Sequence, residues 1–179
     1  MPEVKDFIVP AILSVCCILF IAACATSWAD FGNAFYGFFE ACTDFGFGRI
    51  CVTGSFLGCS SADSTRQAAA AFLVITTIIL AVAAILAVAR LYVAVLANGP
   101  AKIGVIACIG VCIFFGLLAW AISFGLYGGK YCGVKYTDIN GFKIGPSPIL
   151  SLLAWLGIIA AFVAELILNK PIDSAPDAK

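Results

Sequence analysis

The sequence contains no histidine, and only 11% of its residues are charged. Without imidazole the chain lacks the usual ligand of haem iron and of most catalytic zinc ions, and also the side chain that most often relays protons near neutral pH. It also lacks the Cys-x-x-Cys pair on which membrane thiol oxidoreductases depend. We therefore expect a protein that is not an enzyme and that uses neither a cofactor nor a metal.

The chain also carries no formal net charge. The ten lysine and arginine residues equal the aspartate and glutamate residues in number and are dispersed along the chain. Such a chain generates no cationic field to attract phosphate backbones, so we expect no nucleic-acid partner.

The chain is instead rich in apolar residues. Its hydrophobic content is 63%, against roughly 45–50% in an average soluble protein. Four apolar runs predict transmembrane helices, at about residues 7–28, 68–97, 102–127 and 147–168. Each run reaches the roughly 20 residues that a helix needs to cross the hydrocarbon of a bilayer. We interpret residues 1–179 as one all-α membrane domain with four spans.

The first apolar run has a second interpretation, as a secretory signal peptide. Its basic start is weak, because Lys5 stands between Glu3 and Asp6, and the segment from Trp28 to Asp30 is a poor cleavage site. A retained helix is therefore favoured.

Two longer connections, residues 29–67 and 128–146, separate the spans. Asp63, Ser64 and Thr65 supply side chains that can cap the second span. In the later connection, β-branched and aromatic residues together with the Asn140-Gly141 turn signal predict a short strand or a hairpin.

The nine cysteines divide by position. Five lie within the apolar runs, and four lie in the two longer connections: Cys42, Cys51, Cys59 and Cys132. Lysine and arginine divide evenly between the two sides, so the positive-inside rule does not orient the chain. Cysteines in both connections favour an oxidising compartment, which predicts extracellular loops and two cytoplasmic termini in the plasma membrane.

Small residues recur every four positions in the third span, at Gly104, Cys108, Cys112 and Gly116. This spacing places them on one face of a helix. A redox role for the thiols is the alternative, but small residues also let helices approach closely in lipid, and we favour packing.

The first long connection carries a recognisable pattern. Trp28 is followed by Gly37-Phe38-Phe39, then by Cys42 and, nine positions on, by Cys51. This pattern resembles the first extracellular loop of the claudin, peripheral myelin protein and epithelial membrane protein superfamily, with phenylalanines in place of leucine and tryptophan. The amastins have a comparable loop.

The resemblance implies a fold: a left-handed four-helix transmembrane bundle with a small extracellular antiparallel β-sheet. In the family a disulfide staples two strands of that sheet, and the matching residues are Cys42 and Cys51. This pairing leaves Cys59 and Cys132, which we expect to bridge each other, with intermolecular pairing as the alternative. Phe38 and Phe39, at the motif positions, are expected to anchor the loop to the helices.

The resemblance also implies a structural function in cell contact, barrier formation or membrane organisation. The alternative is an accessory subunit that sets the trafficking or gating of a channel or receptor. The expected partners are membrane lipid and other membrane proteins, both in the same membrane and in the opposed one, within homo- or hetero-oligomers.

Within the first long connection, the segment from Phe45 to Arg49 alternates phenylalanine with glycine before the arginine. Phe45 and Phe47 would project to one side of an extended chain, so we expect these rings and Arg49 to contact a partner. The alternative is an aromatic belt that rests on lipid headgroups.

Two charges interrupt the apolar runs, Arg90 in the second and Glu165 in the fourth. An unpaired charge within a bilayer is costly, so we expect the two side chains to pair. The alternative for Arg90 is that its side chain extends to the headgroups.

Overall fold

The computed structural model describes residues 4–55, 57–92 and 100–168. Four long helices make up most of it: α1 (Ile8–Ala25), α2 (Ser60–Tyr92), α4 (Pro100–Gly128) and α5 (Pro146–Leu168). A one-turn 3-10 helix, η1 (Val4–Phe7), precedes α1. All four long helices are long and apolar enough to cross a membrane, as expected for a multi-pass membrane protein.

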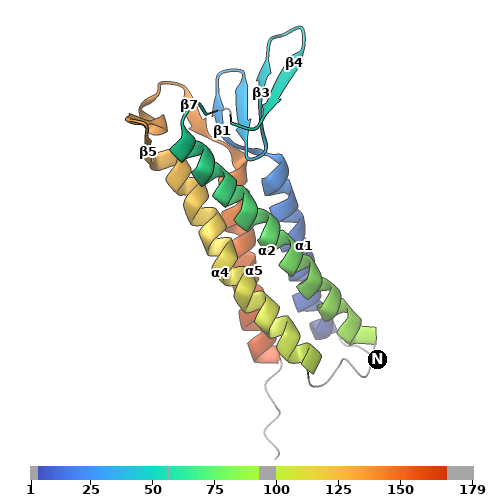
Figure 1. Cartoon of the computed structure of the whole chain (residues 1–179). Helices are drawn as coiled ribbons and strands as arrows, with labels where there is room; N and C mark the ends of the chain where they lie inside the picture. The colour runs from blue at the N-terminus through green and yellow to red at the C-terminus, as the bar shows by residue number, and fades with distance from the viewer. Residues whose placement is uncertain (1–3, 56, 93–99, 169–179) are drawn as a thin grey trace, which may run out of the picture.

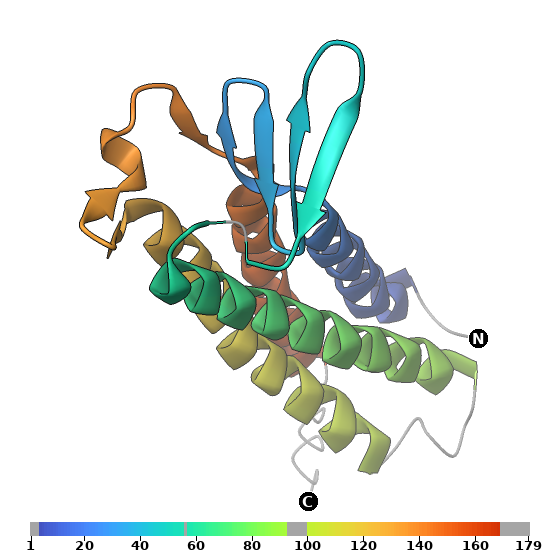
Figure 2. The same cartoon turned by 45° about the horizontal axis from the view of Figure 1, so that its top comes forward.

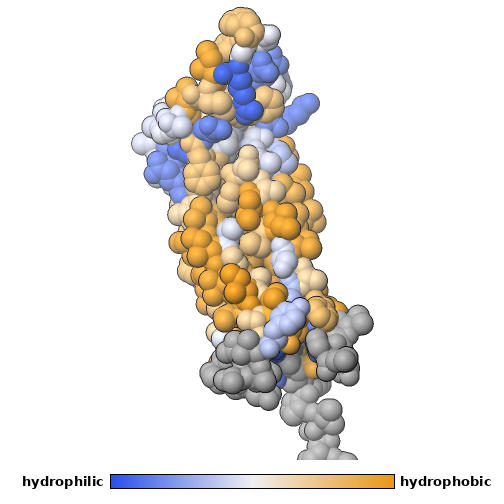
Figure 3. All heavy atoms as spheres, turned by 90° about the vertical axis from the view of Figure 1, so that its right-hand side faces the viewer, coloured by the Kyte–Doolittle hydropathy of each residue, from blue (hydrophilic) through white to orange (hydrophobic). Residues whose placement is uncertain are grey.

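The helices form a bundle in which each packs mainly against two neighbours. α1 lies against α2 and α5, and α4 lies against the same two helices (Figure 1). Fully buried side chains from all four helices fill the centre, among them Phe20, Leu80, Ile109 and Ile158. Large apolar side chains also cover the outside, where Ile18 and Ile85 are 65% and 67% exposed. Figure 3 shows this apolar surface along the helices, bounded by polar residues toward the sheet.

The ends of two spans differ from the prediction. α1 ends at Ala25, and Trp28 lies in a strand because Thr26 has already turned to an extended conformation. α2 begins at Ser60 instead of residue 68, since the apolar run marks only the part of the helix suited to hydrocarbon. Asp63, together with Ser64 and Thr65, therefore lies inside the helix and does not cap it. The expected end of this span at residue 97 lies outside the described residues.

A five-stranded antiparallel sheet stands at one end of the bundle (Figure 1). Its order is β4-β3-β2-β1-β7. Four strands come from the first connection and one from the later connection: β1 (Ser27–Phe31), β2 (Ala34–Gly37), β3 (Glu40–Asp44), β4 (Arg49–Thr53) and β7 (Phe142–Ile144). Pairing of β1 with β7 sets Asp30 opposite Lys143 and joins the two connections into one layer.

The later connection forms its hairpin at a different turn from the one predicted. The two-residue strands β5 (Lys130–Tyr131) and β6 (Val134–Lys135) pair across Cys132 and Gly133. Gly133 has φ +88°, which suits a tight turn. The segment Asn140-Gly141 instead leads from the 3-10 helix η2 (Tyr136–Asp138) into β7.

Close backbone contact fixes the sheet to the bundle where β7 meets α5. The N–H of Gly145 donates a hydrogen bond of 2.8 Å to the carbonyl oxygen of Trp28. A Cβ on Gly145 would lie 2.3 Å from the carbonyl oxygen of Ser27, so no other residue fits there without moving the chain. The start of α5 is thereby attached to the start of β1.

Candidate functional site

The β3–β4 hairpin extends farther from the helices than the rest of the sheet (Figure 2). Cys42 and Cys51 are directly opposed in the two strands, and a disulfide joins them as the resemblance implies. At the tip, the N–H of Phe45 donates to the carbonyl oxygen of Gly48 at 3.0 Å. The N–H of Gly46, which has φ +79°, donates to the Asp44 carboxylate at 3.0 Å. The disulfide and the turn together constrain the backbone of the tip.

The tip carries an exposed aromatic pair. The rings of Phe45 and Phe47 are stacked, with centroids 6.1 Å apart and an interplanar angle of 25°. They are 50% and 92% exposed. The two rings thus lie together as predicted, but a tight turn at Gly46 brings them together and not an extended chain.

Arg49 lies at the start of β4, beyond the tip. Its guanidinium carbon is 5.6 Å from the centre of the Phe35 ring, within the range of a cation–π contact. Arg49 is exposed, and its guanidinium reaches across β3 to this ring on β2. The three predicted contact residues therefore form an apolar tip with a basic residue behind it.

The first residue of the motif, Trp28, lies in a cluster of aromatic rings. Trp28 is fully buried, and its ring lies 5.8 to 6.3 Å from the rings of Tyr36, Tyr136 and Phe142. Its indole N–H has no hydrogen-bond partner among the described residues.

Phe38, in the turn between β2 and β3, is 1% exposed and does anchor the sheet, whereas its neighbour Phe39 is 49% exposed. The expectation that both rings anchor the loop is therefore correct for Phe38 only. A Cβ on Gly37 would lie 2.9 Å from the carbonyl oxygen of Glu40, so the tight turn beside these rings requires glycine.

The sequence did not predict the buried charge cluster beneath the sheet. Arg66, on α2, is 3% exposed and donates hydrogen bonds to the carbonyl oxygens of Phe38 and Gly54. It also lies 3.4 Å from the carboxylate of Asp63, which accepts a hydrogen bond from Ser55. The spacing of Asp63 and Arg66, three positions apart in a helix, is the one signal in the sequence that could have indicated the pair.

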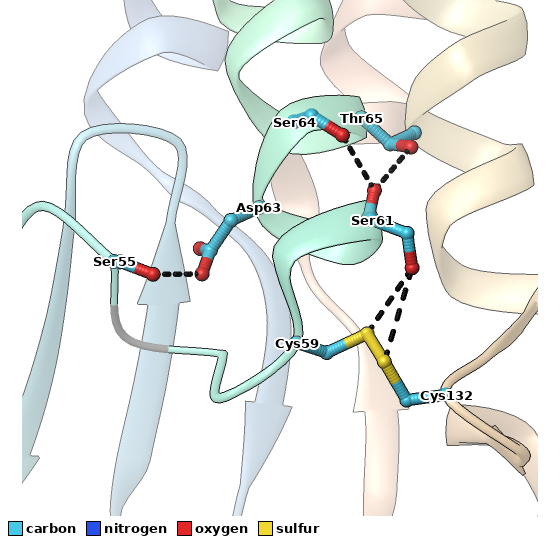
Figure 4. The surroundings of a disulfide bond; sticks show 7 residues. All are labelled: Ser55, Cys59, Ser61, Asp63, Ser64, Thr65 and Cys132. Atoms are coloured by element: carbon cyan, nitrogen blue, oxygen red, sulfur yellow. Dashed lines mark hydrogen bonds between the residues drawn. A yellow bond between two sulfur atoms is a disulfide. The ribbon is translucent and has the colours of Figure 1, made fainter.

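The second disulfide joins Cys59, just before α2, to Cys132 in the β5–β6 turn (Figure 4). The hydroxyl of Ser61 lies 3.2 Å from the Cys59 sulfur and 3.9 Å from the Cys132 sulfur. The bridge attaches the later connection to the first turn of α2, next to the helix turn that carries Asp63.

The hydroxyl of Tyr136, in η2, belongs to the same region. Burial raises the pKa of this phenol, and the negative charge of Asp63 and the neighbouring Tyr131 and Tyr36 raise it further. Tyr136 is therefore held in its neutral form.

At the other end of the bundle, Arg90 and Glu165 pair as predicted. The guanidinium donates a hydrogen bond of 2.6 Å to the carboxylate, and the two side chains are 14% and 4% exposed. The pair links α2 to α5, two helices that otherwise pack mainly on α1 and α4.

The small-residue stripe packs closely at only part of its length. Cys112 is fully buried beside the Thr76 carbonyl oxygen, and a Cβ on Gly116 would lie 3.1 Å from the Trp155 ring. A Cβ on Gly104 would meet nothing within 4 Å. Cys112 and Gly116 therefore act as packing positions, and Gly104 does not.

Among the residues that the structure describes, one group of potential metal ligands lies within the hairpin. The side-chain ligand atoms of Glu40, Cys42 and Cys51 lie within 4.8 Å of one another. The two sulfurs are joined in the disulfide, so a single exposed carboxylate remains, which is too little to hold an ion.

Comparison with known proteins adds no relative. No protein-family model matches the chain, and no curated protein matches it. The resemblance to the claudin superfamily rests on the loop motif.

Proposed function

We propose that this chain is a claudin-like protein of the plasma membrane that contributes to cell contact, barrier formation or membrane organisation. In this proposal the four helices cross the membrane as a left-handed bundle, the usual arrangement of closely aligned helices. The sheet lies outside the cell and both termini lie in the cytoplasm. The role is structural and not enzymatic.

The orientation is supported by the chemistry of the sheet end. Both disulfides lie there, one within the β3–β4 hairpin and one between Cys59 and Cys132. Disulfides persist outside the cell and are rare in the reducing cytosol. The five free cysteines all lie within α1 and α4, inside the apolar part of the bundle: Cys16, Cys17, Cys24, Cys108 and Cys112.

The observation that carries the proposal is the stacked pair of Phe45 and Phe47 at the hairpin tip. The tip lies at the end of a sheet that stands clear of the helices, which favours a protein contact over a belt on the headgroups of the same membrane (Figure 1). Burial of each ring in a partner would contribute about 1.5–3 kcal/mol. That is a weak contact alone, but an array of copies multiplies it.

The partner is another membrane protein, including a second copy of this chain, in the same or the opposed membrane. The test is a co-culture of two cell populations that express the protein with different fluorescent tags. The wild-type protein should accumulate where two expressing cells touch. The variant Phe45→Ser/Phe47→Ser should reach the surface but lose this accumulation.

A matched control removes the same number of apolar side chains from the same hairpin. Ile50 and Val52, on β4, are 58% and 52% exposed and lie opposite Thr43 and Ala41 of β3, below the turn. The variant Ile50→Ser/Val52→Ser should still accumulate at contacts. If the tip variant accumulates at cell contacts as the wild type does, the contact role is overturned. If the wild type does not accumulate at contacts but co-purifies with a larger channel or receptor from the same membrane, the accessory-subunit function is favoured.

A further inference from the structure

A groove of about 550 Å³ runs between the β2–β3 turn and the outer face of α2. The groove is open along one side, so a ligand in it would contact the protein on one face and the surrounding lipid on the other. The half-exposed ring of Phe39 forms one wall, and Ala70 and Ala71 form the floor. Val74 and Ile75 continue the floor along the helix.

The groove has a polar end and an apolar end. Gln67 lies at the sheet end, and Ile75 lies about 12 Å farther along the helix toward the middle of the bundle. Beyond Gln67 the exposed residues of α2 are apolar as far as Tyr92, so Gln67 marks the level at which hydrocarbon begins. A molecule in the groove would therefore have its polar group at the membrane surface and its apolar body in one leaflet.

The polar end carries little net charge. Arg66 lines the groove, but its guanidinium faces Asp63 at 3.4 Å and donates to the carbonyl oxygens of Phe38 and Gly54. Gln67, by contrast, is exposed, and its carboxamide offers both a donor and an acceptor. This end therefore suits a neutral hydroxyl group better than a phosphate.

The apolar part of the groove is lined by short or stiff side chains. The small side chains of Ala70 and Ala71 line it together with the Phe39 side chain, and the β-branched side chains of Val74 and Ile75 are stiff. A rigid, flat ligand loses less conformational entropy in such a groove than a flexible acyl chain does.

We propose that this groove binds one membrane sterol, with its hydroxyl group at Gln67 and its ring system between Phe39 and the Ala70–Ala71 floor. The inference requires the bundle to span a membrane, and it does not depend on any contact made by the hairpin tip. Its failure would therefore leave the contact role intact, and the reverse also holds.

The test uses the purified full-length protein in phospholipid nanodiscs that contain a cholesterol analogue with a diazirine on the ring system and an alkyne tag. After irradiation, labelled peptides are mapped, and unlabelled cholesterol is added as competitor. We expect saturable labelling of Phe39 and of residues 67–75, which competitor abolishes. A photoreactive phosphatidylcholine serves as the comparison probe and should label the helix faces without saturation.

Two variants and one control sharpen the test. Ala71→Trp fills the groove and should abolish the saturable labelling. Gln67→Leu should weaken competition by unlabelled cholesterol about fivefold, which corresponds to about 1 kcal/mol, and Gln67→Asn should restore part of it. The control Ala89→Trp makes the same substitution five helical turns away on the same face of α2. In this variant the sterol probe should label the groove as it does in the wild type.

The melting temperature of each variant distinguishes a loss of sterol binding from a folding defect. It should match that of the wild type within a few degrees. The proposal is overturned if sterol labelling spreads evenly over the bundle, if Ala71→Trp labels like Ala89→Trp, or if the phosphatidylcholine probe competes equally well for the groove.

Discussion

Arg66 on α2 donates a hydrogen bond to the carbonyl oxygen of Phe38 in the β2–β3 turn, and this contact ties the sheet to the bundle. Both residues are nearly fully buried. The same guanidinium reaches the carbonyl oxygen of Gly54, beyond β4, so one side chain holds both ends of the segment that forms β3 and β4. We therefore expect the position of the hairpin relative to the helices to depend on this side chain.

Replacement of Arg66 by methionine should destabilise the protein strongly. It removes the positive partner of the Asp63 carboxylate, which keeps the hydrogen bond from Ser55, and it removes the guanidinium from the carbonyl oxygens of Phe38 and Gly54. Removal of one partner from a buried ion pair costs about 3–5 kcal/mol. Thermal unfolding in detergent, followed by tryptophan fluorescence, measures the effect. The neighbouring variant Gln67→Met should change stability by less than about 0.5 kcal/mol, because the side chain is exposed. Equal effects of the two substitutions would contradict the anchoring role.

The Arg90–Glu165 pair should show coupling in a double-mutant cycle. Glu165→Gln should destabilise the wild type more than it destabilises Arg90→Met, by about 1–3 kcal/mol. The physical reason is the 2.6 Å hydrogen bond between side chains that are 14% and 4% exposed. Additive effects of the two substitutions would instead mean that Arg90 extends independently to the headgroups.

The two disulfides should differ in their contribution to stability. The Cys59–Cys132 bridge spans 73 residues and the Cys42–Cys51 bridge spans nine. In the loop-entropy treatment these separations correspond to about 4.4 and about 2.6 kcal/mol. The paired variants Cys59→Ser/Cys132→Ser and Cys42→Ser/Cys51→Ser should therefore melt in that order, the first at the lower temperature.

A non-reducing gel checks the connectivity of these bridges. The wild-type protein should run as a monomer, because both loop pairs are intramolecular. A ladder of covalent oligomers that disappears in Cys59→Ser would show intermolecular pairing and would contradict the Cys59–Cys132 bridge.

Stability should fall at alkaline pH partly through Tyr136. Its pKa in the folded state lies above the usual value of about 10, because burial and the charge of Asp63 oppose ionisation. Below about pH 10 the phenol is neutral in both states and its contribution is fully present. As pH rises further, the unfolded chain ionises first and stability is lost.

The variant Tyr136→Phe cannot ionise and should lose less stability above pH 10 than the wild type. Melting temperatures between pH 7 and pH 11 measure the difference. Parallel curves for the two proteins would show that Tyr136 ionises equally easily in both states.

Patterns in the sequence predicted the features that depend on composition. Long apolar runs predicted the four helices, since mainly apolar residues suit a bilayer. Two isolated charges, Arg90 and Glu165, predicted their own pairing because each would be costly alone. The alternation of Phe45 and Phe47 with glycine predicted that the rings lie together, although the segment is a tight turn and not the extended chain on which that prediction was based.

Features outside the apolar runs were harder to predict. The first turns of α2 are polar, so hydropathy places the start of the helix too late. Arg66 resembles a surface charge in the sequence, and its burial follows only from where the β2–β3 turn lies. Phe38 and Phe39 are identical neighbours, and only the geometry of that turn determines which one is buried.

Every proposed role of the hairpin requires the sheet to lie outside the cell, and cysteine labelling tests this directly. Phe47 is 92% exposed at the tip of the sheet, and Tyr92 is 73% exposed at the opposite end of α2. A membrane-impermeant maleimide should label Phe47→Cys on intact cells and Tyr92→Cys only after permeabilisation. Labelling of Tyr92→Cys on intact cells, with Phe47→Cys protected until permeabilisation, would contradict the proposed orientation and the contact role that depends on it.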